Sequence, residues 1–165
     1  MVDRADASPR VRPADLRHDT PAVAAAVRAY LVQTEEEKRR ESGTESAALL
    51  VLPERYRPEV DDPSAAYDGC RVLVADLDDR VVGVVVSLAR GGITEVKRLW
   101  ADPRVRGRGV GSALLDAAIA DAEGEVRLSV WEWRERAIRL YESRGFRRAE
   151  SWDPRPRLVC MIRPA

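Results

Sequence analysis

The sequence predicts a mixed α/β domain with one central, mostly antiparallel sheet flanked by helices. Three β-rich stretches follow one another over residues 71–101 with short turns between them, which is typical of an antiparallel meander. Helix-like and strand-like segments then alternate over residues 110–162. The length agrees, because 165 residues make about one domain.

The first residues predict a tail, a strand and a helix. Residues 1–9 are polar and are expected to form a flexible tail, so that residues 10–165 make the single domain. A short strand is predicted at Val11–Pro13. A helix is predicted from Pro21 to Gln33, because Asp19 offers an acceptor at its cap and proline suits its first turn.

Residues 35–68 have a less definite pattern. The charge run over residues 35–41 either continues as a solvated helix or forms a mobile segment. Residues 45–52 are expected to form a second helix, and the prolines at 53, 58 and 63 to mark a loop.

The remaining elements follow from alternation, helical spacing and glycine stops. We expect three strands followed by a helix that ends at Gly124. A further strand, a helix that ends at Gly145 and two closing strands then complete the domain. Their predicted ranges are Arg71–Asp76, Val81–Leu88, Ile93–Ala101, a helix from Val110, Val126–Trp131, Arg134–Arg144, Phe146–Trp152 and Leu158–Ile162.

The composition argues against several classes of protein. Apolar residues make up 45% and charged residues 34%, which is globular, and the formal net charge of zero argues against a nucleic-acid binder. Two cysteines and one histidine predict no disulfide framework and no metal site. No apolar run is long enough to span a membrane, and the polar start predicts no secretory signal, so a cytoplasmic protein is expected.

The segment Arg106-Gly107-Arg108-Gly109-Val110-Gly111-Ser112 lies between a predicted strand and a predicted helix. A helix N-terminus leaves backbone N–H groups unpaired and carries partial positive charge, and glycines let an anion approach those groups closely. Arg106 and Arg108 add guanidinium donors. The segment therefore predicts a pyrophosphate site, with an ordinary strand-to-helix turn as the alternative.

Two common nucleotide motifs do not match this segment. A Walker loop ends in Gly-Lys-Ser/Thr, and the lysine is missing before Ser112. The dinucleotide fingerprint has the spacing Gly-x-Gly-x-x-Gly, whereas the spacing here is Gly-x-Gly-x-Gly. That fingerprint also follows the first strand of a parallel unit, not a meander.

Two blocks resemble the GCN5-related N-acetyltransferase (GNAT) superfamily. The run from Glu95 to Leu115 is similar to its acyl-CoA loop, whose core Arg/Gln-x-x-Gly-x-Gly/Ala corresponds to Arg106–Gly111. The run Ala137–Phe146 is similar to its Ala-x-x-Leu-Tyr-x-x-x-Gly-Phe segment. The blocks stand in the family's order, and the resemblance covers about residues 65–163. It implies a GNAT-like acyl-CoA N-acyltransferase fold.

The resemblance also implies where the acyl donor binds. Acetyl-CoA would lie in an opening between the strand ending at Leu99, Trp100 and Ala101 and the strand Val126–Trp131. A backbone N–H near Trp100 or Ala101 would face the thioester oxygen. The expected cofactor-binding residues of the loop are Arg106, Gly107, Arg108, Gly109, Val110, Gly111 and Ser112.

The catalytic roles are likewise implied by the resemblance. Tyr141 stands where the family usually carries the tyrosine that gives a proton to the thiolate, and a phenol is protonated at neutral pH. Glu95 matches the general base of some members. An ordinary core tyrosine, and a solvated glutamate paired with Lys97, are the alternatives.

The sequence departs from the family at one position. Many members carry an asparagine three residues before Ala137, and this chain has Arg134 there. Arg134 and Ala137 remain expected cofactor contacts, with Arg134 reaching phosphate or the pantetheine arm held by backbone alone.

We expect the protein to transfer an acetyl group from acetyl-CoA to a primary amine of a small molecule or amino acid, by direct attack in a ternary complex. A non-catalytic acyl-CoA-binding module and an acetyltransferase for protein N-termini or lysines are the alternatives. No nucleic acid, membrane or metal is expected as a partner. Family members often form dimers, so a homodimer stays open.

Overall fold

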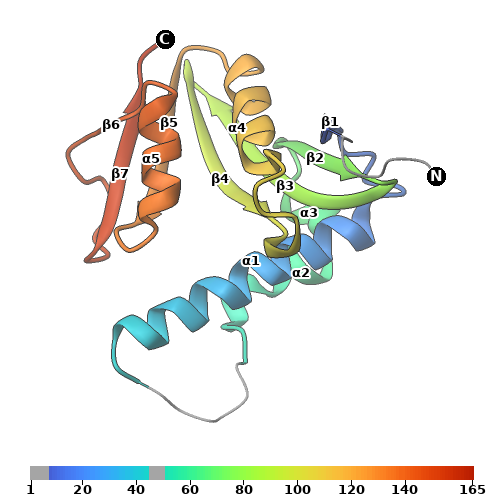
Figure 1. Ribbon diagram of the computed structural model, residues 1–165, viewed down its shortest axis with the longest axis horizontal. Helices are drawn as coiled ribbons and strands as arrows, with labels where there is room; N and C mark the ends of the chain where they lie inside the picture. The colour runs from blue at the N-terminus through green and yellow to red at the C-terminus, as the bar shows by residue number, and fades with distance from the viewer. Residues whose placement is uncertain (1–7, 45–50) are drawn as a thin grey trace.

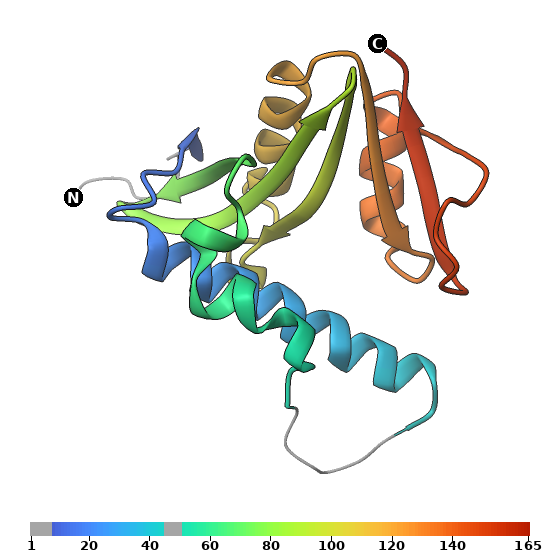
Figure 2. The same cartoon turned by 180° about the vertical axis from the view of Figure 1, so that it is seen from behind.

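The computed structural model describes residues 8–44 and 51–165. Their elements, in chain order, are β1 (Arg10–Pro13), α1 (Thr20–Glu41), η1 (Glu54–Tyr56), α2 (Arg57–Asp61), α3 (Pro63–Ala66), β2 (Arg71–Leu77), β3 (Arg80–Arg90), β4 (Ile93–Ala101), η2 (Pro103–Val105), α4 (Val110–Ala120), β5 (Glu125–Trp131), α5 (Glu135–Ser143), β6 (Arg147–Arg148) and β7 (Leu158–Arg163). The strands form one seven-stranded sheet in the order β1-β2-β3-β4-β5-β7-β6. Helices cover both of its faces (Figures 1 and 2).

The predicted fold class is confirmed. Neighbouring strands run antiparallel from β1 to β4 and from β5 to β6, and β4 and β5 run parallel. The β2–β3 turn has Asp78 and Asp79 at φ 50° and 58°, as a two-residue primed hairpin turn requires. The bounds of β4 are those predicted from alternation.

Helix α1 is longer than predicted. It runs for 22 residues to Glu41, so the charge run is helical. Asp19 occupies its N-cap position but makes no side-chain capping bond, contrary to expectation. Its carboxylate instead accepts bonds from Arg12 and from the backbone N–H of Asp15, which tie β1 to the helix. Among the described residues, no helix has both the length and the apolar character that crossing a membrane requires.

The loop predicted around the three prolines is wrong. Pro58 and Pro63 lie in the first turns of the short helices α2 and α3, where a missing N–H removes no helical bond. The helix expected over residues 45–52 falls mostly on residues 45–50, which lie outside the described residues, and Val51 and Leu52 are not helical. Residues 1–7 of the expected tail also lie outside them.

Two further boundaries differ in the C-terminal half. Helix α4 ends at Ala120, before the Gly124 that was expected to end it. The strand predicted over Phe146–Trp152 shrinks to the two residues of β6, because only Arg147 and Arg148 pair with β7. Phe146 instead turns into the core, where it is 3% exposed.

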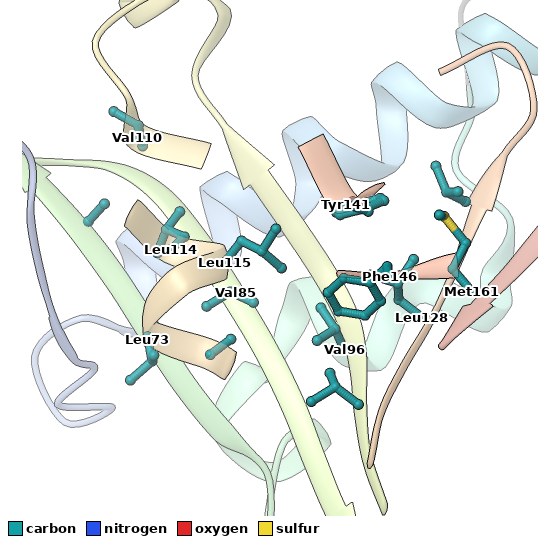
Figure 3. Packing of buried hydrophobic residues seen from close by; sticks show 14 of the residues in the cluster. Leu73, Val85, Val96, Val110, Leu114, Leu115, Leu128, Tyr141, Phe146 and Met161 are labelled. Atoms are coloured by element: carbon teal, nitrogen blue, oxygen red, sulfur yellow. The ribbon is translucent and has the colours of Figure 1, made fainter. Parts of the chain in front are cut away.

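The sheet separates two apolar cores. Helices α4 and α5 cover one face, where Leu114, Leu115 and Tyr141 pack on the strands (Figure 3). Helix α1, with α2 and α3, covers the other face. The members of that second core are Val23, Ala26, Val27, Leu31, Tyr56, Tyr67, Val72, Val74, Val84 and Val86.

Gly83 on β3 lets α4 lie very close to the sheet. A Cβ at Gly83 would come within 2.9 Å of Val110 Cγ1 and within 2.8 Å of Leu114 Cδ1. Any larger residue would push the first turn of α4 away from the sheet. Gly83 therefore sets how close the first turn of α4, and with it the glycine-rich loop, lies to the sheet.

Candidate active site

Strands β4 and β5 separate partway along their length. They pair from Ile93–Glu125 to Val96–Leu128, and no pairing follows beyond that point. On the other side of β4, the register with β3 shifts between Val86 and Ser87, so that Lys97 is an extra, bulged residue. A bulge bends and twists its strand, which accounts for the divergence of β4 from β5. The opening widens toward the end of the sheet at which α4 and α5 begin (Figures 1 and 2).

The opening exposes hydrogen-bonding groups of β4. The N–H of Asp102 donates to the carbonyl of Val82, 2.8 Å away, on the β3 side. Because such bonds alternate along an antiparallel pair, Trp100 also bonds toward β3. The N–H groups of Leu99 and Ala101 therefore face the opening, as a sheet edge that an extended ligand can extend.

The glycine-rich loop presents further free donors beside this edge. Gly107 and Gly109 have φ of 79° and 74°, and a Cβ at Gly107, Gly109 or Gly111 would meet no atom within 4 Å. In the described part of the chain, the N–H groups from Gly109 to Ser112 have no acceptor, because the first bond of α4 is donated by Ala113. Four amides converge at a helix N-terminus that no described side chain caps, which suits an anion.

The loop arginines differ in their environment. The Arg106 side chain is exposed, and no described group binds it. The Arg108 side chain is half-buried and lines a cavity on the β2–β3 side of the loop, away from the opening. The Val110 side chain is buried against the sheet, so its backbone alone faces the loop. Arg106 is thus the loop side chain best placed to join the amides at an anion.

A cavity of about 80 Å³ lies between the diverging strands and contains Tyr141. Leu99 lines it from β4, Ser129 from β5 and Tyr30 from α1. Burial raises the pKa of the Tyr141 phenol above its ordinary value of 10, the nearby Tyr30 adds to this, and Arg134 opposes it. Tyr141 therefore stays protonated at neutral pH, and it lines the same cavity as Leu99 on the free edge of β4.

Glu95 does not share this cavity. It lines an adjoining groove of about 220 Å³ on the α2–α3 side of β4. The groove and the cavity share Val96, Lys97, Arg98, Ser129 and Arg155. Glu95 is exposed, and its carboxylate lies 4.0 Å from the Lys97 ammonium. Its role as a base therefore requires a ligand that passes from the groove into the cavity.

Arg134 lines the cavity with its guanidinium already bonded. It donates to Glu37 Oε2 at 2.7 Å and to Thr34 Oγ1 at 2.8 Å, both on α1. It also lies 5.3 Å from the Tyr30 ring centroid. This arrangement favours a role in fastening α5 to α1 over the phosphate contact considered from the sequence. Ala137, in the first turn of α5, packs half-buried against the core.

Five residues of the site were not identified from the sequence. Tyr30 and Arg98 lie on a helix and a strand that were predicted, but no local motif marks them. Glu37 belongs to the charge run, Glu59 to a segment predicted as a loop that instead forms α2, and Arg155 to the loop before β7. Solvated side chains are the rule in such segments. The Arg98 guanidinium donates two hydrogen bonds to the Glu59 carboxylate, at 2.8 and 2.9 Å, and the two residues lie 39 positions apart in the sequence.

Comparison with known proteins agrees with this geometry. Residues 29–146 match the model of the acetyltransferase (GNAT) family, so the chain belongs to that family. It is similar to a putative acyl-CoA N-acyltransferase from Klebsiella pneumoniae, with 22% identity, TM-score 0.65, and coverage of 96% of this chain and 99% of that one. It also resembles the PaiA N-acetyltransferase from Thermoplasma acidophilum in complex with coenzyme A, with 16% identity, TM-score 0.67, and coverage of 96% and 100%.

A third structure is more distant. A GNAT family acetyltransferase from Elizabethkingia anophelis, with acetyl-CoA bound, is 16% identical with TM-score 0.53, and the match covers 73% of this chain and 95% of that one. At these low sequence identities, the three matches establish that this chain shares the fold of those proteins and nothing more. The site of this chain rests on its own residues.

Proposed function

We propose that this protein transfers an acetyl group from acetyl-CoA to the primary amine of a small molecule or amino acid, by direct attack in a ternary complex. One observation carries the proposal: the free edge of β4 runs from the cavity that Leu99 and Tyr141 line to the strand end from which the glycine-rich loop leads into α4. Family membership and the coenzyme A and acetyl-CoA complexes of two similar structures support it.

Each part of the site has a task in this reaction. Acetyl-CoA supplies a thioester whose carbonyl carbon is the electrophile. The amides from Gly109 to Ser112 hold its diphosphate, with Arg106 beside them. The N–H groups of Leu99 and Ala101 bind carbonyl oxygens of the extended arm, the thioester oxygen included, and so stabilise the negative charge that develops there.

Proton transfers complete the reaction. Glu95 takes one proton from the ammonium group of the acceptor, directly or through a water, and passes it to solvent. The amine nitrogen then forms a bond to the acetyl carbon, and the bond from that carbon to sulfur breaks. Tyr141 donates its proton to the sulfur, and the phenol regains the second proton that the nitrogen loses. The products are an amide, free coenzyme A and one released proton.

Thermal unfolding with acetyl-CoA is the first test. A ligand present at 100 times its dissociation constant adds about 2.7 kcal/mol to the free energy of unfolding, which raises the melting temperature by about 5–10 °C. Release of free thiol from acetyl-CoA is then measured with a panel of amines and peptides. No thermal shift at millimolar acetyl-CoA would contradict the proposal. A shift without thiol release from any acceptor would instead favour the binding module, and release with peptides alone the protein acetyltransferase.

A further inference from the structure

The groove beside the cavity carries both signs of charge. Its charged side chains are Glu59, Glu95, Lys97, Arg98 and Arg155. Its volume of about 220 Å³ suits a small molecule better than a folded protein segment. It shares Val96, Lys97, Arg98, Ser129 and Arg155 with the Tyr141 cavity, so the two spaces join.

One ion pair in the groove is complete without a ligand. Arg98 uses Nε and Nη2 on the Glu59 carboxylate and Nη1 on the carbonyl of Lys97. The Tyr67 hydroxyl donates to the same carboxylate at 2.6 Å. Burial alone would raise the pKa of Glu59, but these hydrogen bonds and the charge of Arg98 hold it below its ordinary value, so the pair stays ionised. Arg98 and Glu59 therefore have little capacity left for a ligand.

Two other cations keep unused donors. Arg155 binds Asp153 through Nε and Nη2, at 2.8 and 2.7 Å, which leaves Nη1. The Lys97 ammonium lies 4.0 Å from Glu95, beyond hydrogen-bond distance. Among the described residues, no acceptor binds Lys97 Nζ, Arg155 Nη1 or the hydroxyl of Ser129, which lines the same groove. The groove thus offers three donors for an anionic group and, in Glu95, one acceptor for a cation.

We infer that the acceptor is a small amino acid-like zwitterion, with its ammonium at Glu95 and its carboxylate at Lys97 and Arg155. The inference rests on the proposed function and names the substrate class of the same site. With Asp153 included, the charged groups of the groove sum to zero, and a zwitterion preserves that balance. A carboxylate engages both spare cationic donors in charge-assisted bonds, whereas an amine without one leaves them unpaired. The step is the acyl transfer described above, with its atoms and protons unchanged.

Matched pairs of acceptors test the inference. Leucine and phenylalanine are compared with isoamylamine and phenethylamine, their decarboxylated counterparts, by thiol release from acetyl-CoA. We expect kcat/KM to be about 10- to 100-fold higher for the amino acids. Lys97→Gln and Arg155→Gln should each bring the kcat/KM of the amino acid closer to that of its amine, mainly by raising KM for the amino acid. Arg157→Gln is the control, because Arg157 belongs to the same loop but binds Glu132 and Glu41 outside the groove.

Cys70 provides a second readout that needs no turnover. It lines the groove and is half-buried, whereas Cys160 is buried. With coenzyme A present, bound leucine should slow alkylation of Cys70 by iodoacetamide several-fold, and isoamylamine should slow it much less. The peptide that carries the label, identified by mass spectrometry, distinguishes Cys70 from Cys160.

The outcomes separate the two proposals. Amines that react as fast as their amino acids would overturn the zwitterion inference and leave the acetyltransferase standing. If no acceptor reacts, the acetyltransferase fails, and the labelling then decides whether the groove binds a zwitterion. Protection by leucine and not by isoamylamine supports it, and equal protection or none overturns it.

Discussion

The two sides of the site are built in different ways. The donor side, the one proposed to bind the acyl donor, is made of main-chain groups, with free amides from Gly109 to Ser112 and at Leu99 and Ala101, all from one stretch of chain. The acceptor side consists of the side chains that line the cavity and the groove, from α1, α2, β4 and the loop before β7. Ion pairs such as Glu59–Arg98 join these elements. Backbone donors cannot be changed by substitution without changing the loop itself. The acceptor side, in contrast, can change one residue at a time, so it can accept a new substrate while the donor stays the same.

The largest effect is expected on the donor side. Gly109→Asp adds a carboxylate where the amides converge, in a backbone conformation that an L residue rarely adopts. We expect loss of acetyl-CoA binding by at least 100-fold, because the added charge competes with and repels the diphosphate. Isothermal titration with coenzyme A measures this.

Gly91→Asp is the matched control for that variant. Gly91 has φ of 60° and open space around it, but it lies in the β3–β4 turn and heads no helix. It should have a similar backbone cost and bind coenzyme A normally. An unchanged dissociation constant for Gly109→Asp would show that the diphosphate binds elsewhere.

A smaller effect is expected where the two sides meet. Tyr141→Phe removes the proton donor to sulfur and should lower kcat about 100-fold or more, with the affinity for coenzyme A unchanged. Because burial raises the pKa of Tyr141, the phenol stays protonated, and its titration should cause no fall in rate up to pH 9. Tyr56→Phe, a buried tyrosine outside the cavity, is the control. If kcat of Tyr141→Phe matches that of the unsubstituted protein, Tyr141 is an ordinary core residue.

The same contrast explains what could be predicted from the sequence. The meander and the loop follow from local patterns, since alternation, turns and glycines act over a few residues. The wide end of the opening depends on a bulge at Lys97, which alternation alone does not show. The acceptor side depends on pairs such as Glu37 with Arg134, 97 positions apart. Such pairs give no local signal, because each partner alone resembles a solvated charge.

The ion pairs of the acceptor side should make stability depend on pH. Burial alone would raise the pKa of Glu37, but hydrogen bonds from Gln33, Arg134 and Trp133 and the charge of Arg134 hold it below its ordinary value of 4.5. A carboxyl group whose pKa is lower in the folded state stabilises the fold above its unfolded pKa, and the effect is lost as the pH falls through the folded value. The free energy of unfolding should therefore be level near neutral pH and decline below about pH 4.5.

Glu37→Gln isolates one of these contributions. The side chains of Glu37 and Arg134 are 16% and 18% exposed, so part of the charge is screened, and we expect a loss of about 1–3 kcal/mol at pH 7. At pH 3 the loss should shrink, because the pH is then below the ordinary pKa of a glutamate, the unfolded state is mostly protonated, and less of the stabilisation from the ion pair remains. Urea unfolding at both pH values measures this, with Glu135→Gln, a 76% exposed partner of Arg139, as the control that changes little. If Glu37→Gln lowers the free energy of unfolding equally at both pH values, the loss comes from poorer packing of the glutamine side chain and not from loss of the ion pair.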